Sequence, residues 1–161
     1  MKRSKLIILI LIPVCLVLIV VGVVAGNRWL SARAAADRAE EQAVEADMFN
    51  RQCKDRLGQI GQGCLAYSRA HSGSFPDTLA AINVVAVCPG SGEQYVYLGK
   101  GFNAASTPPD VAAKYVIAYE PSASHFSQRW FLFADGHLEP FSPQASDPLI
   151  AALKEGKNPP R

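Results

Sequence analysis

Four side chains that can bind a metal ion or exchange protons lie close together in the sequence. The segment HFSQRWFLFADGHLEPFS, residues 125–142, contains His125, Asp135, His137 and Glu139. Imidazole and carboxylate groups are ligands of divalent cations, and they also serve as general acids and bases. His137 and Glu139 are two residues apart, so on a strand they would share one face. This pattern is compatible with a metal or ligand site.

The same residues also fit a structural role in a β-hairpin. Asp135-Gly136 between two apolar runs predicts a tight turn, because Asp and Gly tolerate the positive φ angles that such turns require. Glu139 beside a proline is typical of an exposed edge strand. A catalytic triad with Ser127 lacks the Gly-x-Ser-x-Gly elbow that would support it. We therefore predict a structural hairpin motif made by His125, Asp135 and Gly136, with no catalytic residue and no cofactor. A divalent cation bound by His125, Asp135, His137 and Glu139 is the alternative.

The elements that must position this segment begin with an uncharged run. Residues 6–26 carry no charge, and Lys2, Arg3 and Lys5 precede them. As a helix this run would span roughly 30 Å, the thickness of the hydrocarbon core of a bilayer. Basic residues at this end favour an N-terminus in the cytoplasm, a single membrane pass and an extracytoplasmic C-terminal domain. A cleaved signal peptide is the alternative, although its apolar region usually has about 7–15 residues.

The rest of the chain does not have the charge of a nucleic-acid-binding protein. Without the three basic residues at the N-terminus, the 16 Lys and Arg residues fall to 13, against 14 Asp and Glu residues. Clustered Lys and Arg are also absent, so we expect no nucleic-acid partner.

Three cysteines, Cys53, Cys64 and Cys88, follow the uncharged run. In an extracytoplasmic domain disulfides persist. If Cys53 and Cys64 lie on one helix, their Cα atoms are about 16 Å apart, well beyond the roughly 7 Å that a disulfide permits. Cys88 can therefore pair with either Cys53 or Cys64, and the remaining thiol stays free. No Cys-x-x-Cys spacing indicates a zinc site.

A long helix is predicted between the uncharged run and Pro76. Residues 27–48 are charged and rich in Ala, with no Gly or Pro, which predicts an exposed helical stalk. An apolar stripe with helical spacing then predicts a face that packs on another layer. Its members are Phe49, Cys53, Leu57, Ile60, Cys64, Tyr67 and His71. Three glycines interrupt this helix, and we attribute Gly58, Gly61 and Gly63 to the close approach of that layer.

Short runs of β-branched and aromatic residues follow, which predict strands. These runs are residues 94–98, 114–120, 129–134 and 137–141. A last helix is predicted with Asp147 as its N-cap and Pro148 as its first residue. The elements together predict an α+β fold in which a long N-terminal helix packs on a small antiparallel sheet. The predicted parts are an anchor or signal peptide at 1–26, a stalk at 27–48, an α+β head at 49–146, and a short helix and tail at 147–161.

Several stretches, taken together, resemble the type IV pilin-like, or pseudopilin-like, proteins of planctomycete and verrucomicrobial bacteria. CKDRLGQIGQGCLAYSRAHSGSFPDTL resembles the helix of these proteins, and CPGSGEQYVY resembles the Cys-Pro segment that follows it. His125, nine residues and then Asp135-Gly136 match the closing signature of the family. The resemblance implies a helix covered by an antiparallel sheet, and it favours Cys53 as the partner of Cys88.

The N-terminus departs from the family pattern. The chain has no Gly before residue 22 and no acidic residue before Asp37, so it lacks the prepilin cleavage motif. A bare transmembrane anchor with a pilin-like head fits better than a polymerising pilin. We therefore expect a non-enzymatic protein of the bacterial inner membrane with a periplasmic head. The resemblance implies other pilin-like or secretion-system subunits as partners, in a type II secretion or type IV pilus-like system. The alternative is an envelope domain that binds a divalent metal or small ligand at the Asp-Gly-His hairpin.

Overall fold

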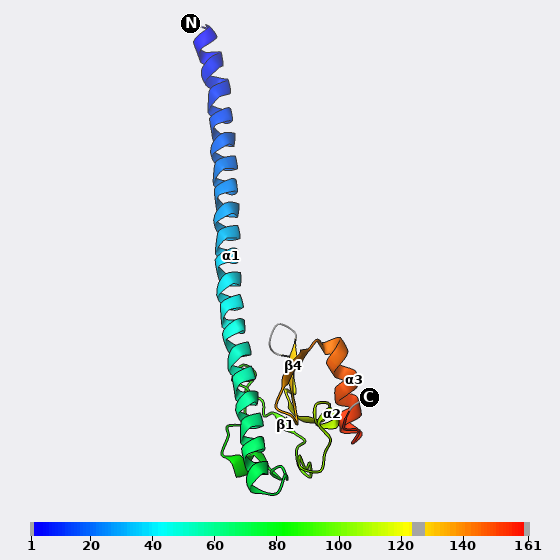
Figure 1. The fold of residues 1–161 in the computed structure, drawn as a ribbon. Helices are drawn as coiled ribbons and strands as arrows, with labels where there is room; N and C mark the ends of the chain where they lie inside the picture. The colour runs from blue at the N-terminus through cyan, green and yellow to red at the C-terminus, as the bar shows by residue number, and fades with distance from the viewer. Residues whose placement is uncertain (1, 124–127, 160–161) are drawn as a thin grey trace. The chain divides into compact units, whose positions relative to one another are not determined.

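The computed structural model describes residues 2–123 and 128–159, with side chains from residue 21 onwards. The chain divides into two compact units, Met1–Val44 and Glu45–Arg161. Helix α1, Lys2–Ala70, makes up the first unit and continues into the second (Figure 1). The sheet and the other helices all belong to the second unit.

In the first unit, α1 has no covering layer among the residues that the structure describes. Every described side chain from residue 21 to residue 44 is exposed, including Trp29 and Leu30. The Arg33 guanidinium lies over the Trp29 ring, 5.4 Å from its centroid. Among the residues described with side chains, no helix combines the length and apolar character needed to cross a membrane. Residues 6–20 of the predicted anchor lie outside that set, and the anchor remains a prediction.

The second unit contains a four-stranded antiparallel sheet, with the strands in the order β1-β2-β3-β4. The α+β class, the long N-terminal helix and the antiparallel sheet predicted from the sequence are therefore confirmed. The strands are β1 (Val96–Tyr97), β2 (Val116–Tyr119), β3 (Arg129–Phe133) and β4 (Leu138–Phe141), and the shorter helices are η1 (Leu79–Ile82), α2 (Pro109–Ala112) and α3 (Pro143–Lys154).

The C-terminal part of α1 packs against one face of this sheet. Four members of the apolar stripe are fully buried: Cys53, Leu57, Ile60 and Cys64. They share a core cluster with Trp130, Leu132 and Ala134, which alternate along β3 and the residue after it. The stripe ends less deeply than predicted, because His71 is exposed.

Two of the three glycines in the last part of α1 lie close to a neighbouring side chain. A Cβ added at Gly61 would lie 3.0 Å from Leu132 Cδ1, and one added at Gly63 would lie 2.9 Å from Ile82 Cδ1. Gly58 is different, since a Cβ there would lie 3.8 Å from Leu138 Cδ1, an ordinary contact. A Cβ at Gly61 or Gly63 would therefore force a neighbouring side chain to shift, whereas a Cβ at Gly58 would not.

Helix α3 covers the opposite face of the sheet, a packing that was not predicted from the sequence. Phe131 and Phe133 of β3 form a second core cluster with Ile150 and Leu153 of α3. Figure 1 shows α1 and α3 on opposite sides of the strands. Strands β2 and β3 are consequently buried on both faces, and their unbroken apolar runs are typical of such strands.

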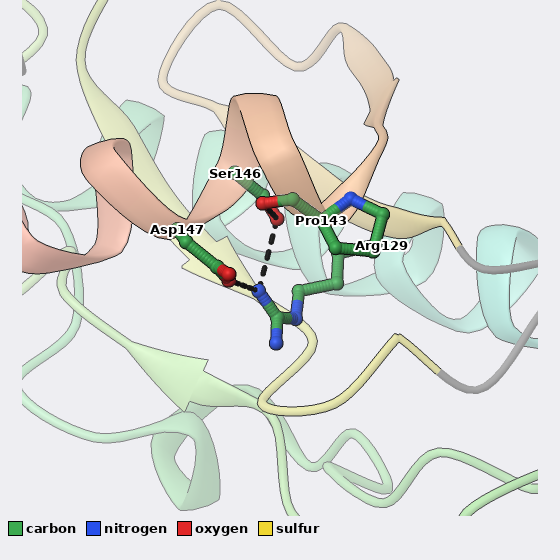
Figure 2. A network of polar contacts seen from close by, with 4 residues as sticks. All are labelled: Arg129, Pro143, Ser146 and Asp147. Carbon is green, nitrogen blue, oxygen red and sulfur yellow. Dashed lines mark hydrogen bonds and ion pairs between the residues drawn. The ribbon is translucent and has the colours of Figure 1, made fainter.

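Helix α3 begins earlier than predicted. Its N-cap is Ser142 and Pro143 is in its first turn, so the predicted start at Asp147 and Pro148 is wrong. Asp147 instead forms an ion pair with Arg129 at the start of β3, and Arg129 Nη1 also donates to Ser146 Oγ at 2.9 Å (Figure 2). These contacts hold the first turns of α3 against the sheet. Pro148 lies inside the helix and has no N–H to donate to the preceding turn.

Candidate functional site

The hairpin between β3 and β4 closes through a three-residue loop, residues 134–136, which joins the hydrogen-bonded Phe133 and His137. The Gly136 N–H donates to Phe133 O at 2.9 Å, and the Phe133 N–H donates to His137 O at 3.0 Å. Gly136 has a φ of +93°, whereas Asp135 is not among the residues with positive φ. The loop is therefore a turn followed by a left-handed glycine, a common three-residue hairpin. The prediction of a turn at Asp135-Gly136 is right, but only the glycine supplies a positive φ angle.

Asp135 and His137 bind each other within this loop. One carboxylate oxygen, Asp135 Oδ1, accepts from the His137 backbone N–H at 3.1 Å and lies 2.5 Å from His137 Nδ1. The His137 ring also stacks on Phe133, with ring centroids 4.3 Å apart and an interplanar angle of 2°. Both polar side chains therefore brace the turn, and the contribution of His137 was not part of the structural motif predicted from the sequence.

Of the other two candidate residues, the structure describes Glu139, which does not join Asp135 and His137 in one group of ligands. His125 lies outside the described residues. Glu139 is exposed on β4, opposite Phe131. Among the described residues, Asp135, His137 and Glu139 are not a group whose ligand atoms could share one ion. The structure thus brings together Asp135, Gly136 and His137 and leaves Glu139 apart.

The three cysteines of the second unit have different environments. Cys53 on α1 and Cys88 form a disulfide, with Cα atoms 5.4 Å apart, and this is the pairing that the family resemblance favoured. Cys64 is the free thiol and is buried. Burial raises the pKa of Cys64 to about 11, although its contact with the Tyr97 hydroxyl at 3.9 Å acts in the opposite direction. A thiol held in its protonated form is a poor nucleophile.

A buried carboxyl group, Glu120, lies beside the disulfide. Its Oε1 is 3.8 Å from Cys88 Sγ, and its Oε2 accepts from the Trp130 backbone N–H at 2.9 Å. Burial raises the pKa of Glu120 to about 7, with the Trp130 hydrogen bond acting against the shift. In the part of the chain that the structure describes, Cys53, Cys88 and Glu120 are the group whose ligand atoms all lie within 4.8 Å.

This cluster was missed from the sequence, where Glu120 is only the last residue of an apolar strand run. The position of Glu120 at the end of an apolar run was the one sign that its carboxyl group could be buried. Glutamate side chains are ordinarily exposed, so burial was not predicted. Because the two sulfurs are bonded to each other and fully buried, they do not offer free thiolates to a metal ion. The arrangement is that of a cross-linked core containing one titratable group.

The fold and these contacts define an α+β protein whose antiparallel sheet has a helix on each face. Comparisons of the chain with family models, with curated proteins and with solved structures find no match. What the protein does must therefore be inferred from its own residues.

Proposed function

We propose that the chain is a membrane-anchored, pilin-like extracytoplasmic protein that acts through protein–protein contacts, as an accessory of a type II secretion or type IV pilus-like system. Helix α1 is the observation that carries this proposal. It contains the uncharged run at 6–26, continues through exposed residues 27–45, and ends in a stripe that packs on an antiparallel sheet. The pilin-like resemblance of residues 50–142 implies the same order of parts.

Two further observations support an extracytoplasmic head and an anchored N-terminus. Val21, Val23 and Val24 are exposed apolar residues at the end of the uncharged run, and Trp29 and Leu30 follow them on the helix. Exposed apolar surface of this kind favours lipid, and Trp is enriched where a helix leaves the bilayer. The Cys53–Cys88 disulfide fits an oxidising compartment.

The location is tested by expressing the full chain in a Gram-negative host. We expect the protein to remain in the membrane pellet after alkaline carbonate extraction, with its N-terminus intact. Protease added to spheroplasts should digest the C-terminal unit. A soluble product whose N-terminus begins after Ala25 would instead identify residues 1–25 as a signal peptide, and a head that is protected in spheroplasts but digested after lysis would place the C-terminal unit in the cytoplasm. Either result contradicts the proposal.

A matched variant separates anchoring from nonspecific membrane association. Two arginines at Leu16 and Ile19 should weaken insertion, because each charge at the centre of a membrane helix costs about 2.5–3.5 kcal/mol. We expect this variant to appear in the carbonate supernatant. Retention of the variant in the pellet would indicate that the uncharged run is not the anchor.

Protein contact is tested with a photoreactive amino acid at exposed positions, Val44 on the stalk and Val85 on the head. After irradiation of the native cells, mass spectrometry should identify pilin-like or secretion-system subunits in the cross-linked products. Products that contain neither class would contradict the proposed role.

A further inference from the structure

A groove of about 640 Å³ lies where helix α1 ends. Tyr67 in the last turn of α1 and His71 just after it line one part of the groove. Ser74, Asp77 and Thr78, from the segment that leads into η1, line the rest. These residues all belong to the second unit of the chain, so the groove is complete within one compact unit.

The segment that lines the groove is held by the loop that follows β1. The Phe75 N–H donates to Phe102 O at 2.9 Å, and the Asn103 side-chain amide donates to both Ser72 O and Ser74 Oγ at 3.2 Å. Phe75 is buried and packs edge-on against the Phe102 ring, with centroids 4.9 Å apart. The groove is therefore preformed, and a ligand that enters it does not have to order this part of the chain.

The charge of the groove favours a cation. Of the described residues that line it, Asp77 carries a carboxylate and none is a lysine or an arginine. The C-terminal end of α1 also points here, and the helix dipole places a partial charge of about −0.5 at that end. Tyr67 adds an aromatic ring, and the face that the stacked His71 ring does not cover can attract a cation.

The orientation of His71 adds a hydrogen-bond acceptor. Its Nδ1 lies 2.8 Å from Tyr67 O, and a carbonyl oxygen can only accept, so Nδ1 carries the hydrogen. In the neutral ring Nε2 is then left as an acceptor. The two rings are stacked with centroids 3.7 Å apart, which fixes the plane of the imidazole.

These features fit a cation with several N–H donors better than a bare metal ion. Among the described residues that line the groove, two side chains could bind a metal ion, those of His71 and Asp77. No third ligand in the described part of the chain joins them in one group. The groove is also far larger than a single ion. A guanidinium group, by contrast, is planar, permanently charged, able to bond a carboxylate with two N–H groups, and able to stack on aromatic rings.

We propose that this groove binds an arginine side chain of a partner protein, with Asp77 pairing with the guanidinium and Tyr67 and His71 lining its path. This deepens the proposed function and rests on it for the identity of the partner as a protein. The recognition of arginine itself does not depend on where the chain is located. A failed membrane assay and a failed binding assay would therefore be distinguishable.

The test uses the full ¹⁵N-labelled chain in zwitterionic detergent micelles, titrated with Nα-acetyl-arginine amide. We expect amide shifts confined to residues 67–81 and a millimolar Kd. Nα-acetyl-citrulline amide, which has nearly the same shape without the charge, should bind about twofold to fivefold more weakly, the factor expected for the loss of one exposed ion pair. Equal binding of the two probes, or shifts outside the groove, would overturn the proposal.

Variants of the carboxylate locate the interaction. Asp77→Asn should weaken arginine binding by about twofold to fivefold, and Asp77→Glu, which keeps the charge, should retain most of it. Asp110→Asn, on α2 and outside the groove, is the matched control and should bind like the unmodified chain. Each variant must first give the same amide spectrum as the unmodified chain in the absence of ligand. Unchanged affinity of Asp77→Asn, or an equal loss in Asp110→Asn, would contradict the assignment.

Discussion

Glu120 is the residue whose chemistry is most altered by its position in the fold. It is 1 % exposed at the end of β2, and burial raises its pKa from 4.5 to about 7. An acid whose pKa is higher in the folded state binds its proton more tightly there than in the unfolded chain. Stability contributed by this group is therefore fully present below about pH 4.5, falls as the pH rises, and is lost above about pH 7.

Glu120→Gln should remove this pH dependence. The amide oxygen can still accept from the Trp130 N–H, and no charge is then buried at any pH. From the shift in pKa, the variant should be more stable than the unmodified chain by about 3 kcal/mol at pH 8.5 and nearly equal to it at pH 4.5. Urea titrations of both proteins at a series of pH values measure the difference. A constant difference across this range would show that Glu120 does not titrate as described.

Gly136 is the residue that the hairpin requires most directly. Alanine at this position must adopt a φ of +93°, and its Cβ would lie 3.1 Å from Leu65 Cδ1 on α1. We expect Gly136→Ala to lower the free energy of unfolding by about 1–3 kcal/mol, through backbone strain and this contact together.

Gly101→Ala is the control for the strain alone. Gly101 has a φ of +79°, and no atom lies within 4 Å of an added Cβ. Thermal or urea unfolding should show a smaller loss for Gly101→Ala than for Gly136→Ala. The reverse order would mean that the contact with Leu65 relaxes without cost.

Residues whose role depends on local chain geometry could be predicted, and those that depend on distant contacts could not. The Asp135-Gly136 dipeptide favours a turn by its own backbone preferences, so the hairpin could be predicted from two adjacent residues. Glu120 is buried because Trp130 and Cys88 surround it, and both are distant in the sequence. Nothing in the local pattern around Glu120 specifies those neighbours.

Among the elements, the last part of α1 shows how packing overrides helix propensity. Gly63→Ala should gain up to about 1 kcal/mol in propensity, yet its Cβ would lie 2.9 Å from Ile82 Cδ1 and 3.3 Å from Ile82 Cβ. We expect a net loss of about 1–2 kcal/mol, because overpacking at a close contact forces side chains or backbone to move.

Gly58→Ala is the matched substitution on the same helix. The added methyl group would make only an ordinary contact with Leu138, so propensity should dominate and stabilise the protein by up to about 1 kcal/mol. Urea unfolding of the two variants should therefore give changes of opposite sign. A gain in both variants would show that η1 moves aside easily and that the approach of Ile82 to α1 is not constrained.

Element types were predicted better than element boundaries for a physical reason. The four strands follow from runs of β-branched and aromatic residues, which have few other ways to bury their side chains. The start of α3 was predicted from Asp147-Pro148, a reasonable cap by local rules. Arg129 at the start of β3 instead engages Asp147 from the sheet, and Pro143 provides the earlier start. A cap is a local signal, and a tertiary ion pair can use the same carboxylate.

At the scale of the whole second unit, the small sheet is stabilised by a core cluster on each of its two faces. One cluster joins the sheet to α1 and the other joins it to α3. The sequence predicted the packing of the sheet on α1, but not the cover that α3 provides on the opposite face. An unbroken apolar strand requires a cover on each face, and Ile150 and Leu153 of α3 provide the second cover.

The disulfide is the covalent link between α1 and the segment that leads into the sheet. It joins residues separated by 35 positions, and closing a loop of this size in the unfolded chain is worth about 3–4 kcal/mol in the chain-entropy model. The double variant Cys53→Ala/Cys88→Ala should lose about that much stability, while Cys64→Ala should lose only the packing of one buried thiol. Adding a reductant during urea unfolding should lower the urea midpoint of the unmodified chain toward that of the double variant. The midpoint of the double variant should not change. The unmodified chain should be fully unfolded and refolded with reductant before its midpoint is measured again. If the midpoint does not change, the two core clusters, and not the cross-link, hold α1 on the sheet.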